Sequence, residues 1–354
     1  MSSRLVRTVI LALVAALLAV AAAQQTRVIV DRMGREVVVP VEINRVVTNW
    51  LPFPSAFFIS TGSLDRLVAV GEGSIQTAGR SMLGRIAPDI LTKETGFASG
   101  TGINAEALLA LQPDLYISYE SQPEIAEVER LGIPVIALDV LSVTGGNPIE
   151  TFAGWMGVLG QLFDQEERTD EIIAYARNVL AETRAMVATV PEDDRPTALF
   201  FSRLEEGNLL INGAGHFGHF WATEAGARNV APAGAPPLAT VNMEEIYAAN
   251  PEVLFISTFS STQPEDLYEN RVPGQDWSHV AAVQNGRVYK LPEGIFQWYP
   301  PSADAPLMMR WIAQQVHPEL FTYDFAAELR DYYSRFYGYQ LSDEEVQLIL
   351  NPVF

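Results

Sequence analysis

The stretches INAEALLALQPDLYI, residues 103–117, and VNMEEIYAANPEVLF, residues 241–255, align with each other without a gap. They share an asparagine, a glutamate, an alanine and a proline at matched positions: Asn104 and Asn242, Glu106 and Glu244, Ala110 and Ala248, and Pro113 and Pro251. Each stretch predicts a helix with an acid in its first turn, an apolar face, a proline that ends the helix, and then a buried strand. This repeated unit predicts two similarly built lobes.

The chain around the repeat alternates strand-like apolar runs with helical segments. LVAV (67–70), LYIS (115–118) and VIAL (135–138) are patterns of short buried strands, and residues 27–47 predict a β-hairpin that turns at Met33-Gly34. This alternation is typical of an α/β fold. With 354 residues and 48% hydrophobic content, the chain can build more than one core, since single cores stop growing near roughly 250 to 300 residues.

A long helical pattern separates the two copies of the repeat. Its apolar residues recur at helical spacing, and no Gly or Pro interrupts residues 161–190. We therefore predict a stiff helical strut over residues 148–192, between an N-terminal lobe over 24–147 and a C-terminal lobe over 193–354, because a flexible linker would be rich in Gly and Ser. The alternative is an ordinary surface helix within one domain.

Residues 1–23 have the pattern of a secretory signal peptide. Arg4 and Arg7 precede the apolar run VILALVAALLAVAAA, and its last three alanines supply a small-residue cleavage site. The run is about 15 residues long, short of the roughly 20 that a spanning helix needs. We expect an exported, soluble mature protein; an uncleaved N-terminal anchor is the alternative.

Composition narrows the function further. The sequence contains no cysteine, which excludes disulfides, thiolate metal sites, cysteine nucleophiles and the cysteine that carries a lipid anchor. A protein free in the periplasm fits best. The formal net charge of -20 makes nucleic acid an unsuitable partner, whereas an acidic surface suits solubility and docking to a basic patch on another protein.

The stretch INGAGHFGHFWATEAGA, residues 211–227, contains G-x-G-x-x-G at Gly213, Gly215 and Gly218. A dinucleotide site needs an acid about 20 positions further on to bind the ribose, and that region, NVAPAGAPPLAT, has none. A secreted nicotinamide-dependent oxidoreductase is therefore kept only as an alternative of another class. The glycines instead predict a loop that lines a cleft, with helix N–H groups available to an anionic group.

Other chemistry has little support. His216 and His219 are three residues apart and could share a helix face, but two ligands are too few, so we predict no metal site and no cofactor. The sequence has no G-x-S-x-G elbow, and its acidic pairs lie among surface-like residues. We expect a protein that is not an enzyme.

Aromatic and arginine residues stand out in the predicted loops from strand to helix. In open α/β sheets ligands bind outside the carboxyl ends of the strands, where these loops gather, and aromatics with a few arginines suit a bulky, partly apolar, anionic ligand. The alternative is that about half of them pack beneath their loops. The predicted ligand residues are Trp50, Phe53, Arg80, Arg85, Tyr119, Arg203, His216, Phe217, Arg271, Trp298 and Tyr299.

Several segments together resemble a known family. They run through nearly the whole mature chain as DRMGREVVVP, NRVV, NAEALLALQPDLYI, GIPVIALD, AGARNVA, NMEEIYAANPEVLFI and DWSHVAAVQNGRVYKLP. In order and spacing the chain is similar to periplasmic substrate-binding proteins of ABC importers that deliver iron-siderophores, haem and cobalamin. Members often have a double glycine where this chain has Ala225-Gly226-Ala227.

The resemblance implies two Rossmann-like α/β lobes joined by one long rigid α-helix, with the ligand between them and only small opening motions. It also implies that Glu106 and Glu244 dock on arginines of an ABC permease in the inner membrane. The expected function is capture and hand-over of a metal chelate, foremost a ferric siderophore, by a monomer. Cobalamin, haem with Tyr119 as a conceivable axial ligand, and an oxyanion such as molybdate are the alternatives.

Overall fold

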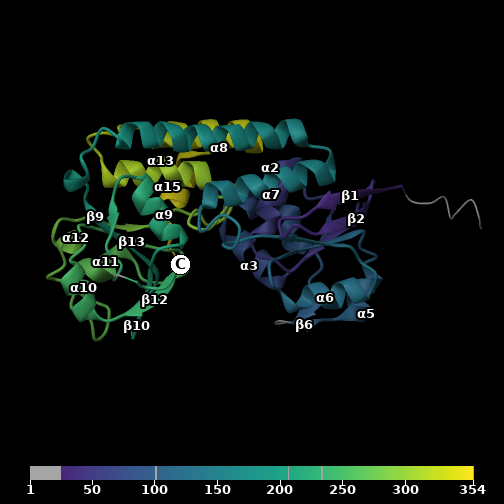
Figure 1. The fold of residues 1–354 in the computed structure, drawn as a ribbon, viewed down its shortest axis with the longest axis horizontal. Helices are drawn as coiled ribbons and strands as arrows, with labels where there is room; N and C mark the ends of the chain where they lie inside the picture. Colours follow the sequence, from purple (N-terminus) through teal and green to yellow (C-terminus); the bar gives the residue numbers. More distant parts are fainter. Residues whose placement is uncertain (1–24, 100–101, 206, 233, 354) are drawn as a thin grey trace, which may run out of the picture.

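The computed structural model describes residues 25–99, 102–205, 207–232 and 234–353, so the predicted signal peptide lies outside the described residues. Figure 1 shows two lobes side by side, with helix α8 running along one side of both. None of the helices within the described ranges is both long and apolar enough to span a membrane. This arrangement of two α/β lobes and a long helix confirms the predicted fold class.

The N-terminal lobe is built on a parallel sheet with strand order β4-β3-β7-β8. An antiparallel hairpin, β1 with β2, lies beside it. The strands are β1 (Thr26–Val30), β2 (Glu36–Pro40), β3 (Val46–Thr48), β4 (Leu67–Val70), β5 (Ala98–Ser99), β6 (Gly102–Ile103), β7 (Leu115–Tyr119) and β8 (Val135–Leu138). The helices are α2 (Phe53–Thr61), α3 (Glu72–Arg80), α4 (Met82–Ile86), η1 (Pro88–Thr92), α5 (Ala105–Ala110) and α6 (Pro123–Arg130).

The C-terminal lobe has a mixed sheet with strand order β12-β10-β9-β13-β14, and β11 also pairs with β9. Strands β11 and β13 are parallel to β9, whereas β10 is antiparallel to both β9 and β12. The strands are β9 (Thr197–Glu205), β10 (Asn208–Asn212), β11 (Arg228–Asn229), β12 (Leu238–Val241), β13 (Val253–Ile256) and β14 (Val288–Lys290). The helices are η2 (Glu192–Asp194), α9 (Phe217–Glu224), α10 (Met243–Ala249), α11 (Pro264–Tyr268), α12 (Ala281–Gln284) and α13 (Ala305–Val316).

The sequence repeat corresponds to the same local structure in each lobe. The Asn104 side chain caps α5 by accepting from the Ala107 N–H at 3.1 Å, and the Asn242 side chain caps α10 in the same way at 3.0 Å. Before each shared proline the backbone turns left-handed, with φ 48° at Gln112 and 36° at Asn250. Each copy then continues into a buried strand, β7 or β13, which is parallel to a neighbour on either side.

The stretch predicted as a helical strut over 148–192 consists of two helices and not one. Helices α7 (Pro148–Phe163) and α8 (Glu166–Val187) are separated at Asp164, whose backbone is left-handed with φ 53°. Aspartate tolerates this conformation, so the break needs neither Gly nor Pro. The two helices pack antiparallel, because Glu150 of α7 pairs with Arg177 of α8 at 2.7 Å and Gly160 faces Thr169.

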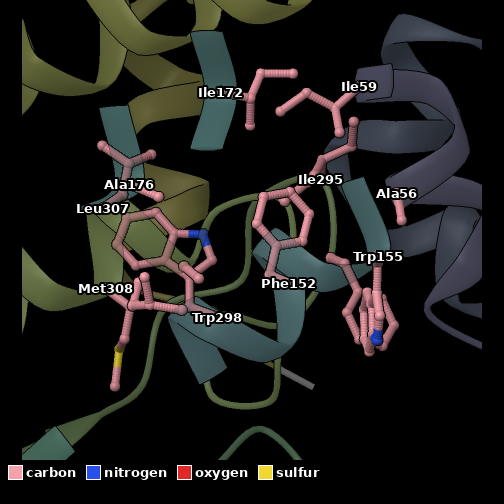
Figure 2. Packing of buried hydrophobic residues seen from close by; sticks show 14 of the residues in the cluster. Ala56, Ile59, Phe152, Trp155, Ile172, Ala176, Ile295, Trp298, Leu307 and Met308 are labelled. Carbon is pink, nitrogen blue, oxygen red and sulfur yellow. The ribbon is translucent and has the colours of Figure 1, made fainter. Parts of the chain in front are cut away.

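Helix α8 contacts both lobes. Near its start, Arg168 Nε donates to the Ile59 carbonyl of α2 at 2.7 Å, and near its end Arg184 pairs with Glu224 of α9 at 2.6 Å. Figure 2 shows Ile172 and Ala176 of α8 in one apolar cluster with Ile59, Leu307 and Met308. A continuous core beneath α8 therefore joins the lobes, which favours small relative motions.

The C-terminal helices close the seam between the lobes. They are α14 (Phe325–Tyr332), a π-helical turn η3 (Tyr333–Tyr337) and α15 (Asp343–Leu350). The Tyr337 ring of η3 stacks on the Phe58 ring of α2 with centroids 6.3 Å apart. The end of the chain thus packs against the N-terminal lobe as well as the C-terminal one.

Candidate ligand cavity between the lobes

A cavity of about 370 Å³ opens between the two lobes. From the N-terminal side it is lined by Trp50, Leu51 and Pro52 after β3, Val140 after β8, and Trp155 on α7. From the C-terminal side it is lined by residues of β9, β10 and β12, by the start of α9, and by the loops after β13 and β14. The cavity therefore lies where parallel strands end, which is the usual ligand position in such sheets.

The N-terminal wall is aromatic. The rings of Trp50 and Trp155 meet edge to face with centroids 4.7 Å apart, and Tyr119 stacks on Trp50 at 5.6 Å from behind the wall. Such pairs hold one another in fixed orientations and present large apolar area. The cavity is thereby given a rigid apolar surface on this side.

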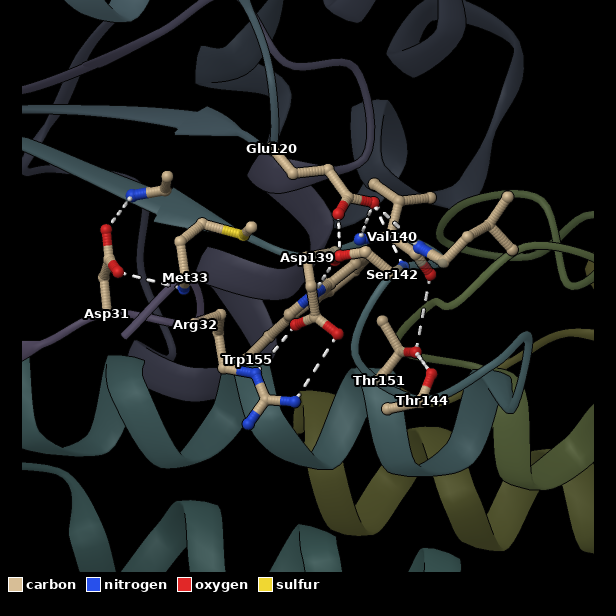
Figure 3. A network of polar contacts seen from close by, with 12 residues as sticks. Asp31, Arg32, Met33, Glu120, Asp139, Val140, Ser142, Thr144, Thr151 and Trp155 are labelled. Carbon is tan, nitrogen blue, oxygen red and sulfur yellow. Dashed lines mark hydrogen bonds and ion pairs between the residues drawn. The ribbon is translucent and has the colours of Figure 1, made fainter. Parts of the chain in front are cut away.

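A polar network fixes this wall from outside the cavity (Figure 3). The indole N–H of Trp155 donates to the Asp139 carbonyl at 2.8 Å, and the Asp139 carboxylate pairs with Arg32 at 2.7 Å. Glu120 accepts from the backbone N–H of Val140 and of Leu141, each at 2.9 Å. Burial opposes ionisation of Glu120, but these bonds and those from Ser142 keep its pKa below the ordinary value.

The C-terminal wall contains a buried polar cluster. Asn212 Oδ1 accepts from the Gly218 backbone N–H at 3.0 Å, and Asn212 Nδ2 donates to Ser202 Oγ at 2.8 Å. His216 Nδ1 lies 2.8 Å from Asn212 Oδ1 and 2.8 Å from the Tyr299 hydroxyl, which also donates to Asn212. Burial raises the pKa of Tyr299, so its hydroxyl stays protonated at neutral pH.

This cluster determines the state of His216. The Gly218 N–H can only donate, so the Asn212 atom that it meets is the carbonyl oxygen, and Nδ1 of His216 must be the donor to that oxygen. Burial also lowers the pKa of His216 to about 4. The imidazole is therefore neutral, and Nε2, which has no hydrogen-bond partner among the described residues, carries a lone pair.

Among the described residues that line the cavity, Arg203 is the one with a charged side chain. It lies exposed on β9, and no carboxylate of the described residues forms an ion pair with it. An unpaired guanidinium beside an apolar cavity can bind a carboxylate or another anionic oxygen through two hydrogen bonds.

Of the eleven predicted ligand residues, the structure gathers five around this cavity: Trp50, Arg203, His216, Phe217 and Tyr299. Tyr119 lies behind Trp50 and does not line the cavity. Phe53 and Trp298 are fully buried and belong to the core. Trp298 lies in a loop as predicted, whereas Phe53 begins helix α2, and neither side chain lines the cavity.

The other three arginines lie elsewhere. Arg80 pairs with Glu293 at 3.2 Å, and Arg85 is 3.9 Å from Glu345, both between the N-terminal lobe and segments near the C-terminus. Arg271 lies among the acids Asp266 and Glu269 beyond α11. Each guanidinium already has an acidic partner, which the sequence alone did not indicate.

Sequence reasoning missed several lining residues. Trp155 was not among the predicted ligand residues, and Phe259 was overlooked although it follows the buried strand β13. The rule that ligands bind at the carboxyl ends of strands could have found Phe259. Nothing in the helical spacing distinguishes Trp155 from its core neighbours, since its ring is almost wholly buried as well.

The glycine motif serves packing. A Cβ on Gly213 would lie 2.3 Å from the Pro236 carbonyl oxygen, and one on Gly218 would lie 2.5 Å from Asn212 Oδ1. The strand before the motif, β10, is antiparallel to both neighbours, whereas a dinucleotide motif follows a parallel strand.

The two histidines of this segment, His216 and His219, have different hydrogen-bond partners. His219 bonds to Asn229 at 3.2 Å, and the described residues include no group of three metal-binding side chains.

The two predicted docking acids occupy equivalent positions. Glu106 and Glu244 are each the second residue of their helix, α5 or α10, and both are exposed. Neither forms an ion pair with another described residue. Figure 1 shows α5 and α10 at the far ends of the two lobes, on the side away from α8.

Comparison with known proteins agrees with this architecture. A sequence profile described as periplasmic binding protein matches residues 58–294, more than half of the chain. The chain belongs to this periplasmic binding protein family. The two-lobe α/β fold agrees with this membership.

Individual relatives cover most of the chain. The molybdate-binding protein MolA of Haemophilus influenzae is 25% identical over 339 residues, or 88% of this chain and 91% of that protein. Its molybdate-bound structure has a TM-score of 0.75 at 22% identity, covering 89% of this chain and 99% of that one. A periplasmic solute binding protein of Veillonella parvula has a TM-score of 0.83 at 29% identity, covering 92% and 97%. A vitamin B12-binding protein of Vibrio campbellii is 25% identical over 241 residues, or 66% of this chain and 79% of that protein.

Proposed function

We propose that this periplasmic binding protein is the substrate-binding component of an ABC importer, and that it captures a metal chelate between its lobes. Its work is binding and hand-over to a permease, without bond chemistry. We expect the mature chain to be a monomer that is free in the periplasm after removal of residues 1–23.

The observation that carries this proposal is the chemistry of the cavity. Two aromatic walls, Trp50 with Trp155 and Phe217 with Tyr299, enclose a space in which Arg203 supplies the positive charge. A volume of about 370 Å³ lies within the range of small-molecule sites, roughly 300 to 1,000 Å³. Apolar faces and a peripheral anionic oxygen are features of a ferric siderophore, whose ligand groups surround the metal. Cobalamin and haem share the apolar faces and are the nearest alternatives.

A second candidate ligand is molybdate. Similarity to MolA over most of the chain favours it, and Arg203 offers a guanidinium to an oxyanion. A small tetrahedral anion needs several hydrogen-bond donors, however, and the described lining is mostly apolar. The cavity therefore fits a chelate better than a bare oxyanion.

Tryptophan fluorescence tests the proposal, because Trp50 and Trp155 line the cavity. The purified mature protein is titrated with an iron(III) tris-catecholate complex, iron(III) citrate, cyanocobalamin, haemin, sodium molybdate and NAD, and thermal unfolding is measured in parallel. Saturable quenching and a rise in Tm with an iron chelate are expected, since a ligand that binds only the native state stabilises it. A response to molybdate alone would mean that the ligand is an oxyanion and not a metal chelate. A response to NAD alone would favour the oxidoreductase.

We further propose that Glu106 and Glu244 are the permease contacts. They are matched in sequence, exposed on separate lobes, and unpaired within the described chain. Two carboxylates on separate lobes can dock on two basic patches of a permease. Their early helical position is also favoured by the helix dipole, and the two roles are compatible.

A further inference from the structure

The loop between β14 and α13 belongs to the cavity and to the contact between lobes at once. Its residues Phe296 and Tyr299 line the cavity. At its start, Glu293 pairs with Arg80 of α3 at 3.2 Å, and the Gly294 carbonyl accepts from the Met82 N–H of α4 at 2.9 Å. The shape of this loop therefore decides both the cavity wall and how the lobes meet.

The loop does not satisfy its own polar groups. Among the described residues, Glu293 Oε2, Gln297 Oε1 and Ser302 Oγ are buried atoms without a hydrogen-bond partner. Such groups cost free energy and need an explanation in a native structure. Hydrogen bonds to the last residue of the loop and to neighbouring elements must hold it in this shape.

Asp304 supplies those contacts from the residue before α13. Its fully buried carboxylate accepts from the Ile295 backbone N–H and the Trp298 indole N–H, each at 2.9 Å on Oδ2. A Cβ on Gly294 would lie 2.2 Å from the same oxygen, so the loop wraps closely around it. No described lysine or arginine forms an ion pair with this carboxylate, which makes its burial expensive.

Two tyrosines complete the surroundings of Asp304. The hydroxyls of Tyr333 and Tyr337 donate to it at 3.1 and 2.7 Å, and both residues belong to the π-helical turn η3. Turns of this kind are rare and often occur at functional sites. Since Tyr337 stacks on Phe58 of α2, the carboxylate connects the cavity loop to a segment that contacts the N-terminal lobe.

We propose that Asp304 is a positioning residue for the ligand: by accepting hydrogen bonds from Ile295 and Trp298, it holds the loop that places Phe296 and Tyr299 in the cavity. This inference rests on the proposed binding function. Asp304 does not touch the cavity, so it acts through the loop.

The role requires an acceptor and not a charge. In an Asp304→Asn variant the amide oxygen can take the place of Oδ2 and accept from Ile295 and Trp298, while the amide nitrogen donates to the Tyr337 hydroxyl. The asparagine variant should therefore keep the loop in place, whereas Asp304→Ala removes the acceptor. Trp298→Phe is a milder change that removes one of the two bonds.

The chain offers a matched control in Asp31. It is also a buried aspartate that accepts four hydrogen bonds, from the Met33, Arg35 and Ala137 backbone N–H groups and from the Arg35 side chain, but it lies in the β1–β2 hairpin. Asp31→Ala should lower stability without changing the cavity loop. It separates a general loss of stability from a loss of positioning.

Two measurements test the proposal. The first is affinity for the iron(III) tris-catecholate complex by fluorescence: we expect a loss of at least roughly tenfold in Asp304→Ala, about threefold in Trp298→Phe, and less than twofold in Asp304→Asn and Asp31→Ala. The second is amide hydrogen exchange over residues 293–301 in the ligand-free protein, which should accelerate in Asp304→Ala and Trp298→Phe only.

The exchange measurement stays informative if the wild type binds none of the chelates, in which case the proposed function fails by itself. The positioning role would be overturned if the loop amides of Asp304→Ala exchange no faster than those of the wild type. It would also be overturned if they exchange equally fast in Asp31→Ala. If Asp304→Ala does not fold, the same test compares Trp298→Phe with Asp304→Asn, and only Trp298→Phe should show faster exchange at the loop. An affinity loss in Asp304→Asn equal to that in Asp304→Ala would show that the charge, and not the acceptor, is required.

Discussion

Nδ1 of His216 lies 2.8 Å from Oδ1 of Asn212. This atom is the amide oxygen and not the nitrogen, because it also accepts a hydrogen bond from the Gly218 N–H. The proton of the neutral imidazole is therefore on Nδ1, and the lone pair is on Nε2. Long-range ¹⁵N NMR of the histidine ring should show one tautomer, protonated at Nδ1, at pH 7. Asn212→Ala should give a mixture of tautomers, while Asn229→Ala, beside His219, should leave the His216 signals unchanged.

The stability of the protein should depend on His216 at acidic pH. Burial lowers its pKa from 6.5 to about 4, so the unfolded chain takes up this proton first as the pH falls. The contribution of His216 is complete above about pH 6.5 and is lost as the pH falls through 4, with a total of about 3 kcal/mol. Urea unfolding of wild type and His216→Gln at several pH values measures this difference. A difference that does not change with pH would contradict the buried neutral state.

Asp304 should show the opposite dependence. Burial raises its pKa from 3.8 to about 6, and the facing tyrosines, Tyr332, Tyr333 and Tyr337, have raised pKa values and stay neutral in this range. Its contribution to stability is complete below about pH 4 and is lost as the pH rises through 6, by about 3 kcal/mol.

Asp304→Asn should therefore gain stability relative to wild type between pH 4 and about 7.5, measured by urea unfolding at each pH. In the wild type the pH-dependent contribution of Asp304 to stability offsets that of His216. Each contribution is therefore measured by comparing its own single variant with the wild type. A constant difference between Asp304→Asn and wild type across this range would show that Asp304 titrates normally.

Arg203 should contribute to affinity for an anionic chelate. A hydrogen bond to a charged group contributes about 1.5 to 3 kcal/mol, so Arg203→Ala should weaken binding by roughly tenfold or more. Arg271→Ala is the control, because Arg271 is also an exposed guanidinium of the C-terminal lobe but pairs with Asp266 and Glu269. Fluorescence titration with the tris-catecholate complex measures both variants. Equal affinities would place the anionic group of the ligand elsewhere.

The docking acids should matter for transport and not for ligand binding. A double variant, Glu106→Ala with Glu244→Ala, should lose stimulation of the reconstituted permease while ligand affinity stays within about twofold, since neither side chain lines the cavity. Glu167→Ala provides a matched control, because Glu167 is also an exposed acid at the second position of its helix, α8. Loss of ligand affinity in the double variant would count against docking.

Local signals in the sequence predicted the fold well. Asn104 and Asn242 cap their helices through their own side chains, and Pro113 and Pro251 end them, so the repeat could be recognised without tertiary information. The reversal of the chain at Asp164 was not predicted, because a left-handed aspartate makes the turn without Gly or Pro. At that residue α7 ends, and α8 packs antiparallel on it.

The sequence by itself determined the class and the two lobes, because caps, prolines and apolar periodicity act over a few residues. Only the tertiary structure decided which side chain of each loop faces the cavity. Trp298 and Tyr299 are neighbours, yet the first turns inward to Asp304 and the second turns to His216 at the cavity wall. Asp304 is six residues from Trp298, but His216 is 83 residues from Tyr299, so the second contact exists only once the C-terminal lobe has folded.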